Sequence, residues 1–396
     1  MSSVSHDDVL VVATRRTPIG AFQGALAPAA APALGAAAIR ATLKDAGVGA
    51  EQLDEVLMGC VLSAGLGQAP ARQAALAAGI PTRVPCTTVS KVCGSGMKAV
   101  MLGSDAIRAG AAAMVLAGGM ESMTNAPYLL GKARSGYRMG HGELLDHMFL
   151  DGLQNAYDGK LMGVFAEATV RRYGFSRGEQ DAYVAGTIAR AMAARSSGAF
   201  QAELTPVAVR SRKGELLVSE DEIPATCDPA KIASLKPAFD KDGTVTAASS
   251  SSIADGASAL LLANAASVQR LSLAPLARVV AAASFAHEPE WFTTAPAGAI
   301  RRVLERAGWR CDGVDLFEIN EAFAVVTLAA IRDLALDPKR VNVNGGACAL
   351  GHPIGASGAR IITTLIHALR RRGLKRGIAA LCIGGGEATA LAVELV

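Results

Sequence analysis

Two pairs of similar segments recur along the chain at nearly the same separation, and this internal repeat constrains the fold more than any other feature. Residues 53–60 (LDEVLMGC) are similar to residues 314–321 (VDLFEINE), and residues 111–119 (AAAMVLAGG) are similar to residues 378–386 (IAALCIGGG). The two offsets are 261 and 267 residues. A separation this regular predicts that the chain folds as two related halves.

Each half is expected to contain the same order of elements. An apolar strand opens each half, VLVVATRRTPIG from residue 9 and LARVVAAASF from residue 276. A helix is predicted next, over residues 34–46 and 297–307, and then a second strand, a glycine-rich turn into a helix, and an apolar strand that ends in glycines. Alternating strands and helices predict an α/β fold, with a mostly parallel sheet in each half and helices on both faces.

The alternation breaks between the halves, over residues 123–246. This stretch contains a long polar helix predicted over residues 177–195 and a charged, hairpin-like segment at 207–223. We interpret it as an inserted loop domain that forms a lid. The predicted division is an N-terminal half made of residues 1–122 with 247–274, the loop domain at 123–246, and a C-terminal half at 275–396.

Composition and charge exclude several classes of protein. The formal net charge is +4 over 396 residues, which is too small for a nucleic-acid-binding surface. The N-terminus lacks the basic region and long apolar run of a secretory signal, which predicts a cytoplasmic protein. The uncharged stretch at 24–39 contains two prolines, so no membrane span is expected there. Seven scattered cysteines without CxxC spacing predict reduced thiols and no metal site.

One cysteine lies in a glycine-rich block, VCGSGMKAV at 92–100. Cys93 directly precedes a segment that is predicted to turn into a helix at Gly94 and Gly96. Backbone N–H groups at a helix N-terminus favour a thiolate, so we expect the pKa of Cys93 to be lowered. The remaining thiols, apart from Cys382, are interpreted as ordinary packing residues: Cys60, Cys86, Cys227, Cys311 and Cys348.

Two further glycine-rich blocks contain reactive side chains. His352 lies in NGGACALGHPIGASGAR (344–360), at the turn equivalent to that of Cys93, and Cys382 precedes three glycines in LCIGGGEATA (381–390). If the two equivalent turns converge, a thiol and an imidazole meet in one cleft, as base-activated nucleophilic catalysis requires. Asn320, in the tetrapeptide NEAF, is a candidate donor to an enolate oxygen. The other histidines are expected to be structural or on the surface: His6, His141, His147, His287 and His367.

These four blocks, in this order, resemble the thiolase family of acetyl-CoA acetyltransferases over essentially the whole chain. The resemblance implies that Cys93 accepts the acyl group and that His352 activates both this thiol and the thiol of coenzyme A. It implies that Cys382 moves the proton at the substrate α carbon. Asn320 would hold a water that, with His352, stabilises the enolate oxygen. The N–H groups of Cys93 and Gly384 would form a second oxyanion hole.

The resemblance also implies a substrate channel and an assembly. Within GTVTAASSSSIADGASA (243–259), Ser251 would contact the pantetheine of coenzyme A, with Ala247 nearby. The rest of the channel would be lined by Leu153, Met162, Phe239, Ala322 and Phe323. The likeness is greatest to the short-chain branch that acts on acetoacetyl-CoA, which is commonly a homotetramer formed as a dimer of dimers. Coenzyme A is a substrate there, no metal or redox cofactor is implied, and Tyr157 suggests a potassium site.

Three positions depart from the family pattern. Leu161 replaces a frequent histidine, Glu387 occupies a position that is often small or apolar, and residues 219–230 lack a basic residue to stack on adenine. Three alternative functions also stay open. One is a β-oxidation thiolase for longer 3-ketoacyl-CoA chains, a second is a decarboxylating ketoacyl synthase, and the third is a module that binds coenzyme A or lipid without catalysis.

Overall fold

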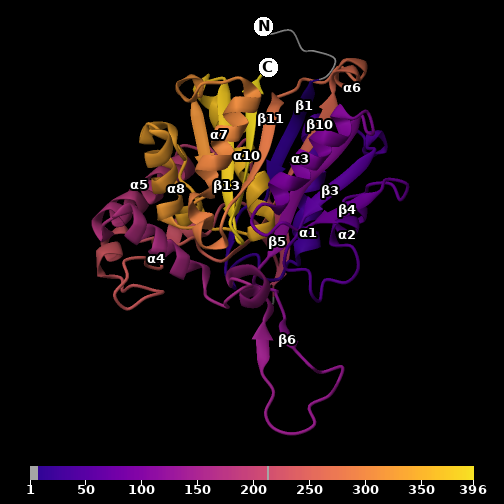
Figure 1. The fold of residues 1–396 in the computed structure, drawn as a ribbon. Coiled ribbons are helices and arrows are strands. Elements are labelled where there is room, and N and C mark those ends of the chain that lie inside the picture. The colour runs from indigo at the N-terminus through magenta and orange to yellow at the C-terminus, as the bar shows by residue number, and fades with distance from the viewer. Residues whose placement is uncertain (1–7, 212–213) are drawn as a thin grey trace.

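A single ten-stranded sheet runs through the molecule in the computed structural model, which describes residues 8–211 and 214–396. His6 and the tip of the predicted charged hairpin lie outside the described residues. Helices cover both faces of the sheet, and an arm that carries strand β6 projects away from it (Figure 1). Within the described ranges, none of the helices combines the length and the apolar character needed to cross a bilayer.

The two halves of the sheet repeat one strand order. The first half contains, in spatial order, β1 (Val9–Arg16), β10 (Ala254–Asn264), β5 (Met114–Ser122), β3 (Glu55–Gly59) and β4 (Cys86–Val89). The second half contains β11 (Ala277–Ala286), β14 (Glu387–Leu395), β13 (Arg376–Ile383) and β12 (Leu316–Ile319). A parallel bridge between Phe317 and Val341 occupies the place of β4 in the second half. The predicted pair of similar halves is therefore confirmed.

The directions of the strands also repeat. In each half the first two pairings are antiparallel and the outer pairings are parallel. The antiparallel pairing of β13 with β14 follows from their short connection, because only antiparallel neighbours can be joined by a tight turn. The short strand β2 (Gly20–Ala21) adds to β10. Strands β1 and β11 pair along Val9–Val11, so the two predicted sheets form one continuous mixed sheet.

The helices form three layers around the two halves, giving the expected αβαβα arrangement. Helices α1 (Ala31–Ala46) and α2 (Pro70–Ala77) pack on the first half, and α7 (Ala295–Ala307) and α8 (Ala324–Leu334) pack on the second. Helices α3 (Ser95–Arg108) and α10 (Ile354–Arg372) lie between the halves. The helices predicted at 34–46 and 297–307 begin a few residues earlier than expected, because Pro32 and Pro296 suit a first helical turn.

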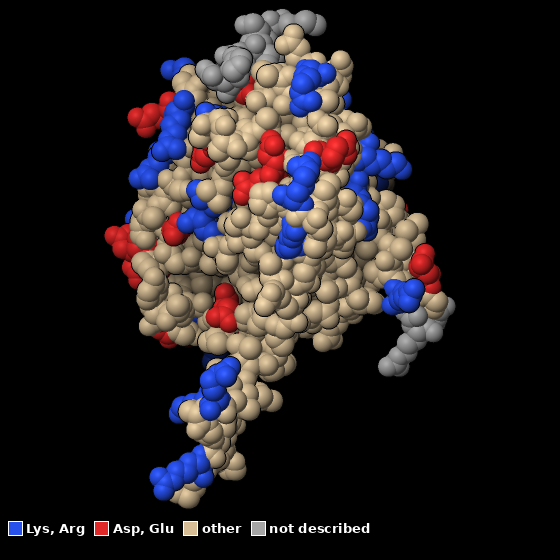
Figure 2. Space-filling view, turned by 90° about the vertical axis from the view of Figure 1, so that its right-hand side faces the viewer, with Lys and Arg blue, Asp and Glu red and all other residues tan. Residues whose placement is uncertain are grey.

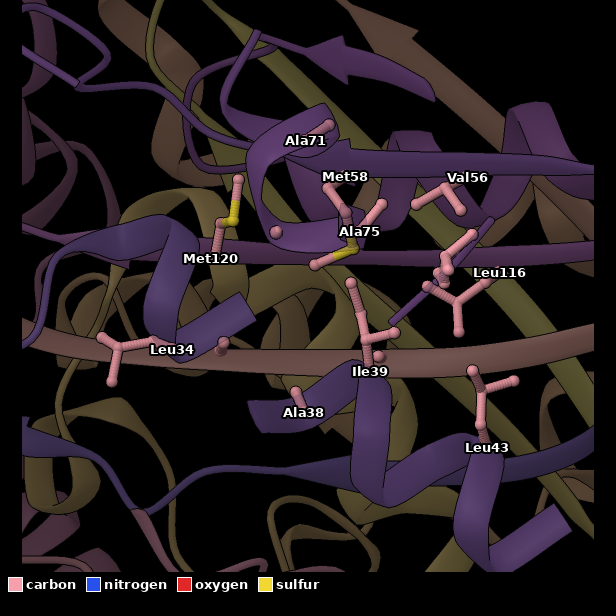
Figure 3. Packing of buried hydrophobic residues seen from close by; sticks show 14 of the residues in the cluster. Leu34, Ala38, Ile39, Leu43, Val56, Met58, Ala71, Ala75, Leu116 and Met120 are labelled. Carbon is pink, nitrogen blue, oxygen red and sulfur yellow. The ribbon is translucent and has the colours of Figure 1, made fainter. Parts of the chain in front are cut away.

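Small side chains let the layers approach closely. In the outer cluster drawn in Figure 3, apolar residues of α1, α2, β3 and β5 interdigitate. A Cβ atom on Gly35 would lie 2.5 Å from the sulfur of Met120. Between the halves, a Cβ on Gly358 of α10 would lie 2.3 Å from the backbone nitrogen of Met97 on α3. Helices α3 and α10 therefore touch backbone to backbone, which brings their N-termini together.

The chain between β5 and β10, over which the sequence predicts a loop domain, forms further helices and strands. They are β6 (Tyr128–Leu130), β7 (Leu144–Asp146), the π-helix η2 (Phe149–Leu153), α4 (Met162–Tyr173), α5 (Arg177–Ser196), β8 (Val207–Ser211), β9 (Gly214–Val218), η3 (Ile223–Thr226) and η4 (Pro229–Ser234). A fully buried guanidinium ties this segment to the sheet. Arg16 of β1 bonds to Glu203 at 2.6 Å and to Asp221 at 2.7 Å.

Short elements complete the chain. They are η1 (Ala50–Gln52), α6 (Ala265–Arg270), η5 (Pro289–Thr294), η6 (Cys311–Gly313), η7 (Pro338–Arg340) and α9 (Ala347–Leu350). Of these, η5 packs against α4 and α8 and so closes one side of the candidate site.

Candidate active site

Cys93 lies in a tight turn between β4 and α3. The preceding residue, Val92, has φ 44°, a strained value for a β-branched side chain. The hydroxyl of Ser95 closes the turn, because it accepts a hydrogen bond from the backbone N–H of Lys91 at 2.8 Å and donates to the carbonyl of Val92 at 2.7 Å. A Cβ on Gly94 would lie 2.4 Å from Cδ1 of Ile383. The turn that contains Cys93 therefore packs directly against the end of β13 in the second half of the sheet.

The surroundings of the Cys93 thiol oppose its ionisation. Burial raises its pKa to about 11, although the backbone N–H groups of Gly384 and of Cys93 itself lower it, and the carboxylate of Glu121 adds to the rise. The predicted lowering of this pKa is therefore wrong, because the loss of water outweighs the N–H groups. The same two N–H groups are those expected to form an oxyanion hole.

His352 lies just before α10 and is held in one tautomer. Its Nδ1 lies 2.6 Å from Oγ of Ser357, and that hydroxyl donates its own hydrogen to the carbonyl of Pro353 at 2.9 Å. The hydroxyl therefore accepts a hydrogen bond from Nδ1–H, which leaves Nε2 as the basic nitrogen. Burial, with a smaller contribution from Arg360, lowers the pKa of His352 to about 3, so the imidazole is neutral.

Asn320 follows β12 and contacts the same imidazole. Its Nδ2 lies 3.4 Å from Nε2 of His352 and 3.5 Å from Nδ1. The Oδ1 atom is buried, and none of the described residues gives it a hydrogen-bond partner. A buried amide oxygen is stable only with a donor, so this atom provides an acceptor for a bound molecule.

Cys382 lies at the end of β13, fully buried beside the first thiol. Burial, and then the neighbouring Cys93, raise the pKa of Cys382 well above its usual value. The glycines after it form a tight turn, with φ 92° at Gly385 and 87° at Gly386. A Cβ on Gly386 would lie 2.4 Å from the carbonyl oxygen of His287, so this turn packs directly on backbone. All seven cysteines lie within the described residues as free thiols.

An apolar cavity of about 210 Å³ opens onto Cys93 and His352, whereas Asn320 and Cys382 are buried and do not line it. Its wall includes Cys93, His352, Gly384 and the predicted channel residues Leu153, Met162, Phe239, Ser251, Ala322 and Phe323. Of the other predicted residues, Ala247 is exposed and does not line this cavity, and Tyr157, predicted to mark a potassium site, is 76% exposed in a loop. Sequence reasoning missed other wall residues, namely Phe149, Gly152, Gly163, Ser250, Ile253, Phe292 and Ile354; Leu161, noted only as a departure from the family pattern, also lines it.

Two buried carboxylates hold the loops of the site, and neither was predicted. Glu121 accepts hydrogen bonds from the N–H groups of Val61, Leu62 and Gly355 at 3.0, 3.1 and 2.9 Å. It thereby connects the loop after β3 to the first turn of α10. Burial raises the pKa of Glu121 to about 7. A single acidic residue within the apolar run MVLAGGMESM was the available signal.

Glu321 plays the equivalent part beside Asn320. Its carboxylate accepts hydrogen bonds from the hydroxyl of Tyr183 at 2.6 Å, the hydroxyl of Thr187 at 2.9 Å and the amide of Asn342 at 2.9 Å. It also accepts the N–H of Cys348 at 3.1 Å. The acidic residue of NEAF thus orders the loop that leads to His352.

Comparison with known proteins gives matches along nearly the whole chain. Family models match at residues 9–266 (thiolase, N-terminal domain) and 273–395 (thiolase, C-terminal domain). An acetyl-CoA acetyltransferase of Pseudomonas aeruginosa is 52% identical over 386 residues, covering 97% of this chain and 98% of the relative. One of Cupriavidus necator is 49% identical over 391 residues, covering 98% and 99%.

Solved structures agree with this result. The Bacillus anthracis acetyl-CoA acetyltransferase superposes with a TM-score of 0.96 at 40% identity, covering 98% of this chain and 99% of that chain. A thiolase from Ascaris suum, solved in complex with coenzyme A, superposes with a TM-score of 0.93 at 43% identity, covering 98% and 100%.

Proposed function

The chain belongs to the thiolase family, and we propose that it is an acetyl-CoA acetyltransferase that cleaves acetoacetyl-CoA with coenzyme A and, in reverse, condenses two molecules of acetyl-CoA. One observation carries the proposal. The thiol of Cys93 and the neutral imidazole of His352 line one apolar cavity, the amide of Asn320 contacts that imidazole, and the thiol of Cys382 is buried beside Cys93, although the four groups come from separate blocks of the sequence. A cysteine hydrolase needs only one of these thiols.

In the proposed mechanism, Nε2 of His352 takes the proton of the Cys93 thiol as the sulfur attacks the 3-keto carbon. The negative charge on that oxygen is stabilised by the N–H groups of Cys93 and Gly384, which already point at the sulfur. The carbon–carbon bond then breaks, leaving an acetyl group on Cys93 and the enolate of acetyl-CoA. A neutral thiol and a neutral base suit this step, because no charge has to be buried before substrate arrives.

The departing enolate needs a donor for its oxygen and a proton for its carbon. His352, now protonated, would donate to the enolate oxygen together with a water held by Asn320, whose Nδ2 lies 3.4 Å from Nε2 of His352, and Cys382 would be the proton donor to carbon. The proton on His352 then returns to the Cys382 thiolate, which leaves the imidazole neutral. His352 next takes the thiol proton of coenzyme A as that sulfur attacks acetyl-Cys93. Collapse of the tetrahedral intermediate releases a second acetyl-CoA, and the Cys93 thiolate takes the proton back from His352. In the condensing direction Cys382 removes the proton from acetyl-CoA.

The cavity wall favours a short acyl group. Phe149, Leu161 and Phe292 line the same cavity of about 210 Å³ as Cys93 and His352, and a volume this small suits a short acyl group. Longer 3-ketoacyl-CoA substrates are the competing possibility, and steady-state thiolysis across acyl chain lengths separates the two. We expect kcat/KM to be highest for acetoacetyl-CoA and to fall as the chain lengthens.

The first experiment is replacement of the nucleophile. In Cys93→Ser the rate of thiolysis of acetoacetyl-CoA should fall at least about 1,000-fold, because near neutral pH an alcohol is a far weaker nucleophile than a thiol. Labelled acetyl-CoA should acylate the wild-type chain at Cys93 and leave the variant unlabelled. Near-normal thiolysis by Cys93→Ser would exclude the proposed function.

We also propose a homotetramer, formed as a dimer of dimers. The arm at residues 128–146 exposes large apolar side chains, with Met139 94% exposed and Leu144 66% exposed. Figure 2 shows basic side chains gathered along the same arm. Exposed apolar groups of this size favour contact between subunits. Light scattering should give four chains for the wild type and fewer for a deletion of residues 131–143.

A cytoplasmic location and a potassium site near Tyr157 stay predictions.

A further inference from the structure

An ion pair joins the two catalytic turns across the halves of the molecule. The ammonium group of Lys91 contacts the carboxylate of Glu387. Lys91 lies two residues before Cys93, and Glu387 lies three residues after Gly384. The glutamate is one of the positions at which this chain departs from the family pattern, and the mechanism above does not use it.

Each partner is attached rigidly to its own turn. The backbone N–H of Lys91 donates to Ser95 at 2.8 Å, and its carbonyl accepts the N–H of Gly94 at 3.0 Å. On the other side, Glu387 is the first residue of β14 and pairs with Ile383, the last residue of β13. The ion pair therefore connects the residue at the start of the Cys93 turn to the residue at the end of the glycine turn.

The glycine turn has little else to fix its first residue. Gly384 has no side chain, and the three atoms nearest to a Cβ built there all belong to side chains, the nearest being Cε of Met162 at 3.6 Å. Gly386, by contrast, packs on the carbonyl oxygens of His287 and Glu288. The position of the Gly384 N–H relative to the Cys93 sulfur thus depends on how the ends of the turn are held.

We infer that Lys91 and Glu387 are positioning residues that hold the N–H of Gly384 against the acyl group on Cys93. The inference rests on the proposed thiolase reaction. Loss of one oxyanion-hole donor costs about 100- to 1,000-fold in kcat, and a donor that is displaced but still present should cost about tenfold. Neither Lys91 nor Glu387 lines the cavity, so KM should change little.

The experiment is a double-mutant cycle on the active enzyme. The variants are Glu387→Gln, Lys91→Met and the two combined, assayed for thiolysis of acetoacetyl-CoA with thermal unfolding measured alongside. The matched control is Glu220→Gln, which breaks another partly exposed pair between separate elements, that of Glu220 with Arg195. The side chains of the Lys91 pair are 23% and 38% exposed, so breaking either pair should change the unfolding midpoint little.

The expected result is a fall of about tenfold in kcat for each single variant, KM for both substrates within about twofold, and no further loss in the double variant. The control should keep the wild-type kcat. Additive losses in the double variant, an unchanged kcat, or a loss confined to KM would each overturn the inference. Absence of thiolysis in the wild type would instead contradict the proposed function, so the two failures are distinguishable.

Discussion

The hydroxyl oxygen of Ser357 lies 2.6 Å from Nδ1 of His352, and the same hydroxyl donates a hydrogen bond to the carbonyl of Pro353. One block of sequence, GHPIGASGAR, thus supplies both the base and the group that fixes its tautomer. The arrangement leaves Nε2 of a neutral imidazole unprotonated, 3.4 Å from Nδ2 of Asn320, so that in the proposed mechanism it can accept a proton from Cys93 and later from coenzyme A.

Ser357→Ala should lower kcat for thiolysis by about 10- to 100-fold and leave KM nearly unchanged, because the imidazole loses the partner that selects its tautomer. Steady-state kinetics on acetoacetyl-CoA measure both constants. Thr363→Val is the control, since it removes another buried hydroxyl from the same helix, one that bonds to Thr14 and Ser258 and not to His352. Equal losses in the two variants would show that helix packing, and not the tautomer, explains the effect.

The reactivity of Cys93 in the free enzyme should rise with pH well beyond neutrality. Burial raises the pKa of this thiol to about 11, so it stays protonated until the solution becomes strongly alkaline. The pKa of His352 is lowered to about 3, so no imidazolium is present near pH 7 to stabilise a thiolate. The rate of alkylation by iodoacetamide should therefore climb about tenfold per pH unit between pH 7 and 10.

Mass spectrometry of the peptide that contains Cys93 separates this reaction from alkylation of the half-buried Cys86, Cys227 and Cys311. Cys93→Ser provides the blank for that peptide. A rate that levels off below pH 8 would mean that a thiolate and an imidazolium already exist as a pair, contrary to the geometry described.

Cys382→Ala should separate the two chemical steps. Transfer of an acetyl group between coenzyme A and Cys93 needs no proton at carbon, so exchange of label between acetyl-CoA and free coenzyme A should fall less than about tenfold. Condensation and thiolysis need that proton and should fall more than about 1,000-fold. The two assays on one preparation test the assignment, with Cys348→Ala as a control at another buried thiol. Parallel losses in both assays would remove Cys382 from its proposed role.

The site residues that lie in glycine-rich blocks could be predicted from the sequence. Properties that depend on how deeply a group is buried could not. The internal repeat predicted that Cys93 and His352 come from equivalent turns, because such turns lie at the same edge of each sheet. The predicted direction of the Cys93 pKa shift was wrong, because the sequence indicates the helix N-terminus but not the burial that removes water from the thiol. The supporting role of Glu121 depends on contacts with segments about 60 and 234 residues away, which no local pattern indicates. The continuous sheet was missed for the same reason.

Gly94→Ala should weaken the contact between the halves at the active site. The added Cβ would lie 2.4 Å from Cδ1 of Ile383, and overpacking of this kind typically costs about 1–3 kcal/mol. We expect a lower thermal unfolding midpoint and a reduced kcat, because the turn that holds Cys93 must move. Ile383→Val removes Cδ1, so the double variant should recover part of both losses relative to Gly94→Ala alone. Gly313→Ala, at a glycine with open space around it, should change neither quantity. If Ile383→Val recovers nothing, the contact of Gly94 with Ile383 is not what makes a glycine necessary there.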